Sequence, residues 1–415
     1  MNKHFDRAHA KILAERLRET PRFMIVVTGP RQIGKTTLVR RALTGLSAAF
    51  IAADNPTPTA KEGNKTMGYS AAYGATPNPE WLVEQWMQAR AQARALPPGQ
   101  FYVLAIDEIQ KVPRWSEVVK GLWDADRAEG LALHIILLGS SPWLMQRGLT
   151  ESLAGRHEPI QMSHWSYGEM SAAFDFSLEE YIFFGGYPGA ATMVQDEPRW
   201  RRYVRNALIQ PNIDKDILQL TRVDKPALLR TLFELGCGAY SGQMVALTKI
   251  VGQLQDVGNT VTLSHYLDLL SQAGLLSGLQ KYAGQEHRRR ASPPKFNAHN
   301  TALISSQAQY TFAQAKSDRS YWGRLVESAV GAHLLNNLPE NVRLHYWRDS
   351  PNEVDFVLCA GDQLLAIEVK SGNDYAAPKG LMSFVDKFKH AKPLIVGEGG
   401  VSLAEFLLQP VSHWL

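Results

Sequence analysis

The stretch VVTGPRQIGKTT, residues 26–37, decides the fold of this chain. Gly29, Gly34, Lys35 and Thr36 stand at the spacing G-x-x-x-x-G-K-[ST], a complete match to the phosphate-binding P-loop. Such a loop needs a strand before it and a helix after it. The flanking sequence therefore tests the match.

Both flanks have the required pattern. Residues 23–27, FMIVV, form a short apolar run typical of a buried parallel strand, and residues 36–43, TTLVRRAL, read as a helix. This order predicts an α/β fold built on a parallel sheet.

The loop is expected to hold the phosphates of ATP with its backbone N–H groups at the helix N-terminus. Lys35 is expected to reach the β- and γ-phosphate oxygens as a catalytic residue, and the Thr36 hydroxyl is expected to ligate Mg²⁺. The predicted nucleotide-binding residues of the loop are Gly29, Pro30, Arg31, Gln32, Ile33, Gly34, Lys35, Thr36 and Thr37.

Two further apolar runs supply the remaining groups of this site. Residues 101–110, FYVLAIDEIQ, end a strand with Asp107, expected to hold Mg²⁺, and Glu108, expected to orient or deprotonate the attacking water. An acidic pair that caps the next turn is the alternative. The run HIILLGSS ends in Ser140 and Ser141, and Ser140 is expected near the γ-phosphate.

Arg156 follows a glycine in the loop SLAGRHEPI. Its guanidinium could stabilise the transferring phosphoryl group across a subunit boundary, and a surface salt bridge explains the residue equally well.

The order of these motifs resembles a known family. GPRQIGKTT, IDEIQKVPRW, LLGSS, SLAGRHEPI, YGE and FFGGYPG are together similar to the prokaryotic AAA-type (AAA_14-like) ATPases with a C-terminal DUF4143-like region. The resemblance covers nearly the whole chain. It implies that Arg156 is a finger acting in trans, and hence a homo-oligomer.

Composition excludes several classes of protein. The 415 residues carry a net charge of +4 and no apolar run long enough to span a bilayer, so a cytoplasmic protein without membrane partners is expected. Cys237 and Cys359 are far apart and predict neither a disulfide nor a zinc site. The segment 55–80, rich in Pro, Gly, Thr and Asn, reads as a flexible insertion, with a partner-sensing loop as the alternative.

Two basic stretches stand out, RWRRYVR at residues 199–205 and KYAGQEHRRRASPPK at residues 281–295. Between them lie three helical patterns followed by a strand, the order of a winged helix, with Leu263–Ser271 as its recognition helix. That helix offers Ser264, His265 and Tyr266 as contacts but also carries Asp268. DNA binding and a packing role between domains both remain open.

The C-terminal part resembles the restriction-endonuclease-like core. A helix carries Glu327, and two strands in NEVDFVLCAGDQLLAIEVKSG carry Asp355 and the pair Glu368 and Lys370. By position, the three carboxylates would be metal ligands and Lys370 the group that assists a metal-bound water. The alternatives are a solvated face of a hairpin and an inert scaffold.

The predicted domains are an ATPase domain at 1–170, a helical lid and connector at 171–222, a winged helix at 223–294 and a restriction-endonuclease-like domain at 295–415. The sequence favours a Mg²⁺-dependent ATPase that moves a winged-helix and nuclease-like module on DNA. The alternative is an ATP-dependent signalling switch that controls a protein partner, with a catalytically inert nuclease-like domain.

Overall fold

A computed structural model describes residues 5–53, 77–140, 152–218, 223–253, 259–283, 292–372 and 378–415, together with Met145 and Leu149. The chain divides into two compact units, Met1–Met162 and Ser163–Leu415. Most of the predicted insertion at 55–80, all but residues 77–80, lies outside the described residues.

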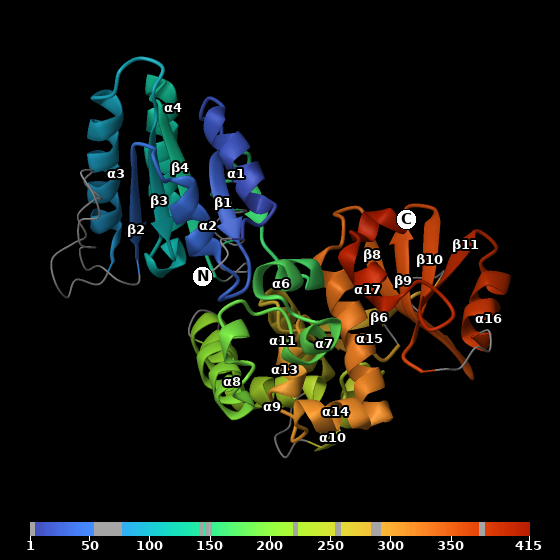
Figure 1. The fold of residues 1–415 in the computed structure, drawn as a ribbon. Helices are drawn as coiled ribbons and strands as arrows, with labels where there is room; N and C mark the ends of the chain where they lie inside the picture. The colour runs from blue at the N-terminus through green and yellow to red at the C-terminus, as the bar shows by residue number, and fades with distance from the viewer. Residues whose placement is uncertain are drawn as a thin grey trace. The chain divides into compact units, whose positions relative to one another are not determined.

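The first unit is a parallel sheet with helices on it (Figure 1). Its five strands lie in the order β2-β3-β4-β1-β5, and every neighbouring pair is parallel. The predicted α/β fold with a parallel sheet is thus confirmed. The elements are α1 (His9–Arg18), β1 (Met24–Thr28), α2 (Lys35–Ala42), β2 (Ala48–Ala52), α3 (Pro79–Arg94), β3 (Tyr102–Asp107), η1 (Ile109–Lys111), α4 (Trp115–Glu129), β4 (Leu133–Gly139) and β5 (His157–Gln161).

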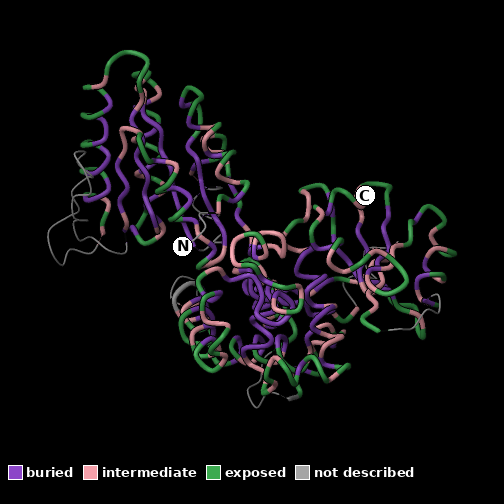
Figure 2. Tube along the Cα trace, viewed as in Figure 1, coloured by how far each residue is buried: buried purple, intermediate pink, exposed green. Residues whose placement is uncertain are grey.

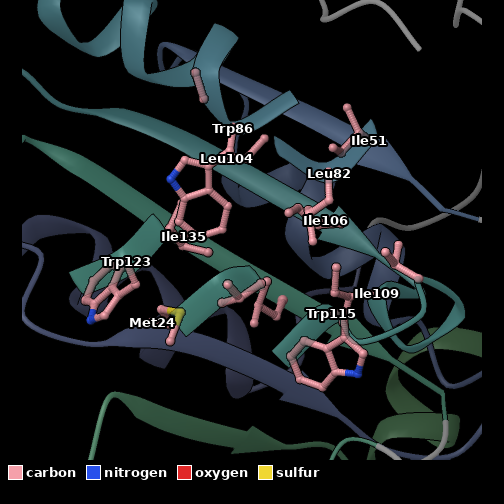
Figure 3. Packing of buried hydrophobic residues seen from close by; sticks show 14 of the residues in the cluster. Met24, Ile51, Leu82, Trp86, Leu104, Ile106, Ile109, Trp115, Trp123 and Ile135 are labelled. Carbon is pink, nitrogen blue, oxygen red and sulfur yellow. The ribbon is translucent and has the colours of Figure 1, made fainter. Parts of the chain in front are cut away.

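The core of this unit packs helices against the parallel sheet. Trp86 of α3 and Trp123 of α4 pack with strand residues such as Leu104 and Ile135 on one face of the sheet (Figure 3). Asp126 of α4, only 1% exposed, accepts hydrogen bonds from Trp86 Nε1 at 2.7 Å and Arg90 Nε at 2.5 Å. Apolar packing and one paired buried charge thus hold α3 and α4 together.

The second unit begins with short helices and ends in a mixed sheet (Figure 1). Its sheet has six strands in the order β11-β10-β9-β8-β6-β7. The elements are α6 (Tyr167–Phe174), α7 (Leu178–Phe184), η2 (Ala191–Met193), α8 (Glu197–Tyr203), η3 (Val204–Ile209), η4 (Asn212–Ile217), α9 (Pro226–Cys237), α10 (Leu247–Gln253), α11 (Thr260–Gln272), β6 (Leu276–Lys281), β7 (Lys295–Ala298), α13 (Ala302–Ser305), α14 (Phe312–Ser317), α15 (Arg319–Asn336), β8 (Arg343–Asp349), β9 (Asn352–Ala360), β10 (Gln363–Lys370), α16 (Lys379–Lys387), β11 (Ala391–Gly397), α17 (Leu403–Leu408) and η5 (Val411–His413).

Part of the basic stretch at 199–205 forms hydrogen bonds within the protein. Arg201 donates to the carbonyl oxygens of Ser305 at 2.7 Å, Ala308 and Tyr310, and Arg205 donates to Ser306 O at 2.6 Å. These carbonyls end α13 and the turn after it, where a helix leaves such groups unpaired. Two of the four arginines therefore hold α8 and η3 to α13.

The predicted winged-helix segment, 223–294, contains the expected order of three helices and a strand, α9, α10, α11 and β6. Strands β6 and β7 pair with each other, and β6 also pairs with β8. The predicted boundary at 294/295 therefore falls inside one continuous sheet. The four-domain division stays a prediction.

Helices cover the second sheet. Helix α16 contacts β9, β10 and β11, and α15 contacts β7 and β10. Figure 2 shows the buried residues following the strands of both units, with the exposed ones on the outer helices and turns. Among the described residues, no helix is long and apolar enough to cross a membrane.

Candidate nucleotide site and a carboxylate cluster

The P-loop is shaped by two glycines. Gly34 caps α2 in the left-handed conformation, with φ 96°, where a side chain would add strain. Gly29, with φ 146°, lies so close to the carbonyl oxygen of Met162 that a Cβ atom would collide with it. The loop is therefore held in a shape that leads the chain from β1 into the N-terminus of α2.

Lys35 and Thr36 begin α2 and point back into the site. Lys35 Nζ donates to Gly29 O at 2.8 Å and Pro30 O at 2.7 Å, and the residue is 7% exposed. The Thr36 hydroxyl donates to Asp107 Oδ2 at 2.7 Å. Since β1 and β3 are both parallel to β4, the loop after β1 and the acidic end of β3 lie at the same edge of the sheet.

These oxygens suit Mg²⁺. A hydroxyl and a carboxylate 2.7 Å apart are hard oxygen donors, which Mg²⁺ prefers, and they lie beside a loop shaped for phosphates. Thr36 and Asp107 are thus the residues that would hold the ion.

Glu108 is fixed by two polar neighbours. Ser140 Oγ donates to Glu108 Oε2 at 2.9 Å, and Gln110 Nε2 donates to the same oxygen. The backbone of Glu108 has φ 53°, a left-handed conformation that is uncommon outside glycine and often occurs at functional sites. Burial raises the pKa of Glu108, while Arg31 and the Ser140 hydrogen bond act to lower it. A raised pKa suits a carboxylate that accepts a proton.

Gln110 is a residue of this site that the sequence did not predict. It lies two residues after Glu108, in the turn η1 that follows β3, so its amide reaches back to the carboxylate. The only signal for it in the sequence was its place in the stretch DEIQ. Ser141, which was singled out with Ser140, lies outside the described residues.

Arg156 is far from the P-loop of its own chain. It precedes β5, whose first residue His157 pairs with Met24 at the start of β1, whereas the P-loop follows the end of β1. Five residues of strand span about 16 Å. Arg156 instead pairs with Asp124, with Nε to Oδ1 at 2.7 Å and Nη2 to Oδ2 at 3.0 Å. Arg156 therefore lies about the length of a strand away from the P-loop of its own chain.

Of the residues predicted to contact DNA, some are exposed and one is buried. On α11, Ser264, His265 and Asp268 are exposed. Tyr266 is 2% exposed and its hydroxyl accepts from Lys225 N at 3.0 Å, so its prediction as a contact was wrong because the ring is part of the core. Arg288, Arg289 and Arg290 lie outside the described residues.

In the second unit, two of the predicted metal ligands meet a buried lysine. Lys295 Nζ lies 2.6 Å from Glu327 Oε1 and 3.2 Å from Asp355 Oδ1, and it also donates to the main-chain oxygen of Asp355 at 3.1 Å. Lys295 comes from β7, Glu327 from α15 and Asp355 from β9. We call Lys295, Glu327, Asp355 and Glu368 the carboxylate cluster.

A β-bulge places Asp355. His345 of β8 pairs with Val357 and Trp347 pairs with Val354, so one residue of β8 faces two of β9, Asp355 and Phe356. Simple alternation does not continue through such a bulge. The side chain of Asp355 accepts a hydrogen bond from Val369 N at 3.0 Å, and this bond ties β9 to β10 beyond their last ladder pair.

Glu368 and Lys370 stand at the end of β10. Glu368 Oε2 is buried without a hydrogen-bond partner. Burial and the nearby charge of Asp355 raise the pKa of Glu368, and burial raises that of Glu327 against the opposing charge of Lys295. The pKa of Lys295 is also raised, because the two carboxylates outweigh its burial.

The cluster does not fit a metal ion. Among the residues that the structure describes, no three acidic, His or Cys side chains are arranged to hold one. An ammonium group already lies between Glu327 and Asp355. The roles of Glu327, Asp355 and Glu368 as ligands, and of Lys370 beside them, stay predictions.

Models of known protein families match three stretches of the chain. An AAA domain profile matches residues 21–171, and two domains of unknown function match residues 175–312 (DUF8612) and 322–405 (DUF4143). Uncharacterized proteins of Mycobacterium tuberculosis and Mycobacterium bovis are each 26% identical over 382 residues, which is 91% of this chain and 76% of the relative.

A solved structure gives the same fold. The Walker-type ATPase of Pyrococcus abyssi is similar with a TM-score of 0.50 at 15% identity, over 73% of this chain and 96% of that one. At this identity the likeness concerns the fold. The matched AAA domain and DUF4143 region, together with the P-loop geometry, support an AAA-type P-loop ATPase with a C-terminal DUF4143 region.

Proposed function

We propose that this protein is a Mg²⁺-dependent ATPase whose ATP cycle rearranges the C-terminal unit, and that this unit acts on DNA. The observation that carries the ATPase proposal is the meeting of Lys35, Thr36, Asp107 and Glu108 at one edge of the parallel sheet. Each of these groups has a defined part in hydrolysis of the γ-phosphate.

The roles follow from the contacts. Backbone N–H groups at the start of α2 hold the phosphates, and Lys35 exchanges the carbonyl oxygens of Gly29 and Pro30 for phosphate oxygens. Thr36 and Asp107 hold Mg²⁺, which neutralises phosphate charge when bound. Glu108, oriented by Ser140 and Gln110, accepts a proton from the attacking water.

Glu108→Gln tests this assignment. The amide keeps the size of the side chain and cannot accept the proton, so hydrolysis is expected to fall by about 10²–10⁴-fold while ATP binding persists. Binding of a fluorescent ATP analogue and release of phosphate measure the two separately. Unchanged hydrolysis in Glu108→Gln overturns the role of Glu108.

Arg156 is proposed to act on the ATP of a neighbouring subunit. Its distance from its own P-loop supports an action in trans. Its pair with Asp124 is the surface salt bridge that the alternative interpretation expects. The proposal implies a homo-oligomer.

The DNA proposal rests on the order of elements from α9 to β6 and on the exposed side chains of α11. Its test is a titration of duplex and branched DNA at increasing salt. Phosphate contacts predict an affinity that falls steeply as salt rises. No binding at low salt, or binding that ignores salt, contradicts the proposal.

A signalling switch is the second candidate. The internal use of Arg201 and Arg205, and the exposed Asp268 on α11, reduce the basic surface that DNA would need. In that case the ATP state controls a protein partner through the C-terminal unit. ATP-dependent capture of a protein by a chain that binds no DNA would favour it.

A further inference from the structure

Lys295 lies at the centre of the carboxylate cluster, with three oxygen atoms close to its ammonium group. A lysine ammonium has three N–H donors. Three oxygen atoms lie around Nζ, namely Glu327 Oε1 at 2.6 Å, Asp355 Oδ1 at 3.2 Å and the main-chain oxygen of Asp355 at 3.1 Å. Nζ also lies 4.7 Å from the centre of the Phe356 ring. The ammonium is thus enclosed by negative and π-electron-rich groups.

The backbone around Lys295 is fixed on both sides. Leu279 of β6 pairs with Lys295, and Met244 forms a bridge with it from the other side. Gly242 N donates to Phe296 O at 3.0 Å in the same stretch of chain. Lys295 itself is 3% exposed, so its ammonium is shielded from solvent.

We propose that Lys295 is a built-in cation that takes the place of a divalent metal ion in the carboxylate cluster and closes this site to metals. The C-terminal unit then works without metal-dependent cleavage, as a binding or switching module. This inference concerns the second unit alone and is independent of ATP hydrolysis.

Charge and distance carry the argument. A divalent ion bound by Glu327 and Asp355 must lie roughly 2.0–2.6 Å from an oxygen of each. The ammonium lies 2.6 Å and 3.2 Å from these oxygens, so the ion and Nζ would compete for nearly the same position. Two cations at such a separation repel strongly in a buried site.

The cluster also has a structural effect. Lys295 connects β7, α15 and β9 through one buried group, and the carboxylate of Glu327 lies next to Gly242. Glu368 stays outside this pairing, with Oε2 buried and unbonded. Removal of the ammonium would leave the carboxylates of Glu327 and Asp355 without a cation between them, and carboxylate oxygens are donors that Mg²⁺ and Mn²⁺ prefer.

The test is a titration of the full chain with Mn²⁺ in the absence of nucleotide, followed by electron paramagnetic resonance of free Mn²⁺. The wild type is expected to bind no Mn²⁺ through the cluster. Lys295→Met, which keeps an unbranched side chain only one atom shorter, is expected to bind Mn²⁺ at least about tenfold more tightly because one opposing charge is gone. Added Mn²⁺ is expected to raise its melting temperature.

The matched control is Lys387→Met. Lys387 also pairs with a carboxylate, Asp349, at 2.6 Å, but its side chain is 53% exposed. This variant is expected to bind no Mn²⁺.

Three outcomes overturn the inference. One is Mn²⁺ binding by the wild type that Glu368→Gln abolishes. Another is a folded Lys295→Met that gains no Mn²⁺. If Lys295→Met does not fold, Lys295→Met/Glu327→Gln keeps the net charge of the wild type. This double variant is expected to bind Mn²⁺ through Asp355 and Glu368. The third overturning outcome is a double variant that binds no Mn²⁺.

Discussion

Two buried lysines, one in each unit, meet very different oxygens. Lys35, 7% exposed, donates to two carbonyl oxygens of its own loop at 2.8 Å and 2.7 Å. Lys295, 3% exposed, lies 2.6 Å and 3.2 Å from two carboxylate oxygens. The first lysine can exchange neutral carbonyls for phosphate oxygens, whereas the second already has its counter-ions.

The difference teaches how to read a buried lysine near acidic residues. A lysine between carboxylates forms a closed pair, and breaking such a pair is costly because a buried charge is left alone. A lysine on backbone carbonyls at a helix N-terminus is placed for an anion. The two cases are distinguished by the atoms that accept the lysine's hydrogen bonds, and residue type alone does not distinguish them.

The largest expected effect is the loss of ATP turnover in Lys35→Ala. Without the ammonium, the phosphates lose their charged partner, so both ATP binding and phosphate release are expected to be lost. Lys11→Ala is the control, because Lys11 is exposed on α1 of the same unit and pairs only loosely with Glu15 at 4.0 Å. Turnover retained in Lys35→Ala would sink the nucleotide-site assignment.

The second effect is on stability. Lys295→Ala leaves two partly buried carboxylates without their partner, and the free energy of unfolding is expected to drop by about 3–5 kcal/mol. Lys387→Ala removes an exposed pair and is expected to cost about 0–1 kcal/mol. Urea unfolding followed by tryptophan fluorescence compares the two variants. Equal losses of unfolding free energy in the two variants would show that the ion pairs of Lys295 stabilise the protein no more than those of a surface lysine.

A smaller effect is expected at Arg156. Arg156→Ala is expected to leave ATP binding nearly intact and to slow hydrolysis by about 10³-fold or more. In a mixture with Lys35→Ala, each subunit type supplies what the other lacks, so part of the activity should return. Hydrolysis that stays absent in the mixture would favour a mechanism within one subunit or a structural role for the pair with Asp124.

The smallest effect is a shift in the pH profile of hydrolysis. Glu108 acts in its ionised form, so activity rises with pH through its raised pKa. The Ser140 hydrogen bond lowers that pKa, and Ser140→Ala is therefore expected to move the acidic limb to higher pH. Thr44→Ala, at an exposed position on the same unit, is the control. If the acidic limb of the Ser140→Ala profile stays in place, the Ser140 hydrogen bond does not set the pKa of the group that accepts the proton.

The sequence predicted the ATPase fold well because local patterns determine it. The apolar strand before Gly29, the helix after Lys35 and the strand that ends in Asp107 each follow from a short run of residues. Parallel pairing then places their ends together.

The carboxylate cluster was predicted only in part, because its central residue, Lys295, is far in the sequence from the carboxylates that it contacts. Lys295 counted only as one charge of a basic stretch, since nothing near it in the chain shows that its side chain meets Glu327 and Asp355. The bulge at Asp355 and Phe356 also breaks the alternation on which the side-chain directions depended.

One incubation tests the central claim that the lysine site of the first unit performs chemistry and that of the second does not. The full chain is mixed with ATP, Mg²⁺ and end-labelled linear and flapped DNA, and ADP and DNA fragments are measured together. The account predicts ADP production with intact DNA. DNA cleavage that is lost in Glu368→Ala and in Lys370→Ala would contradict it.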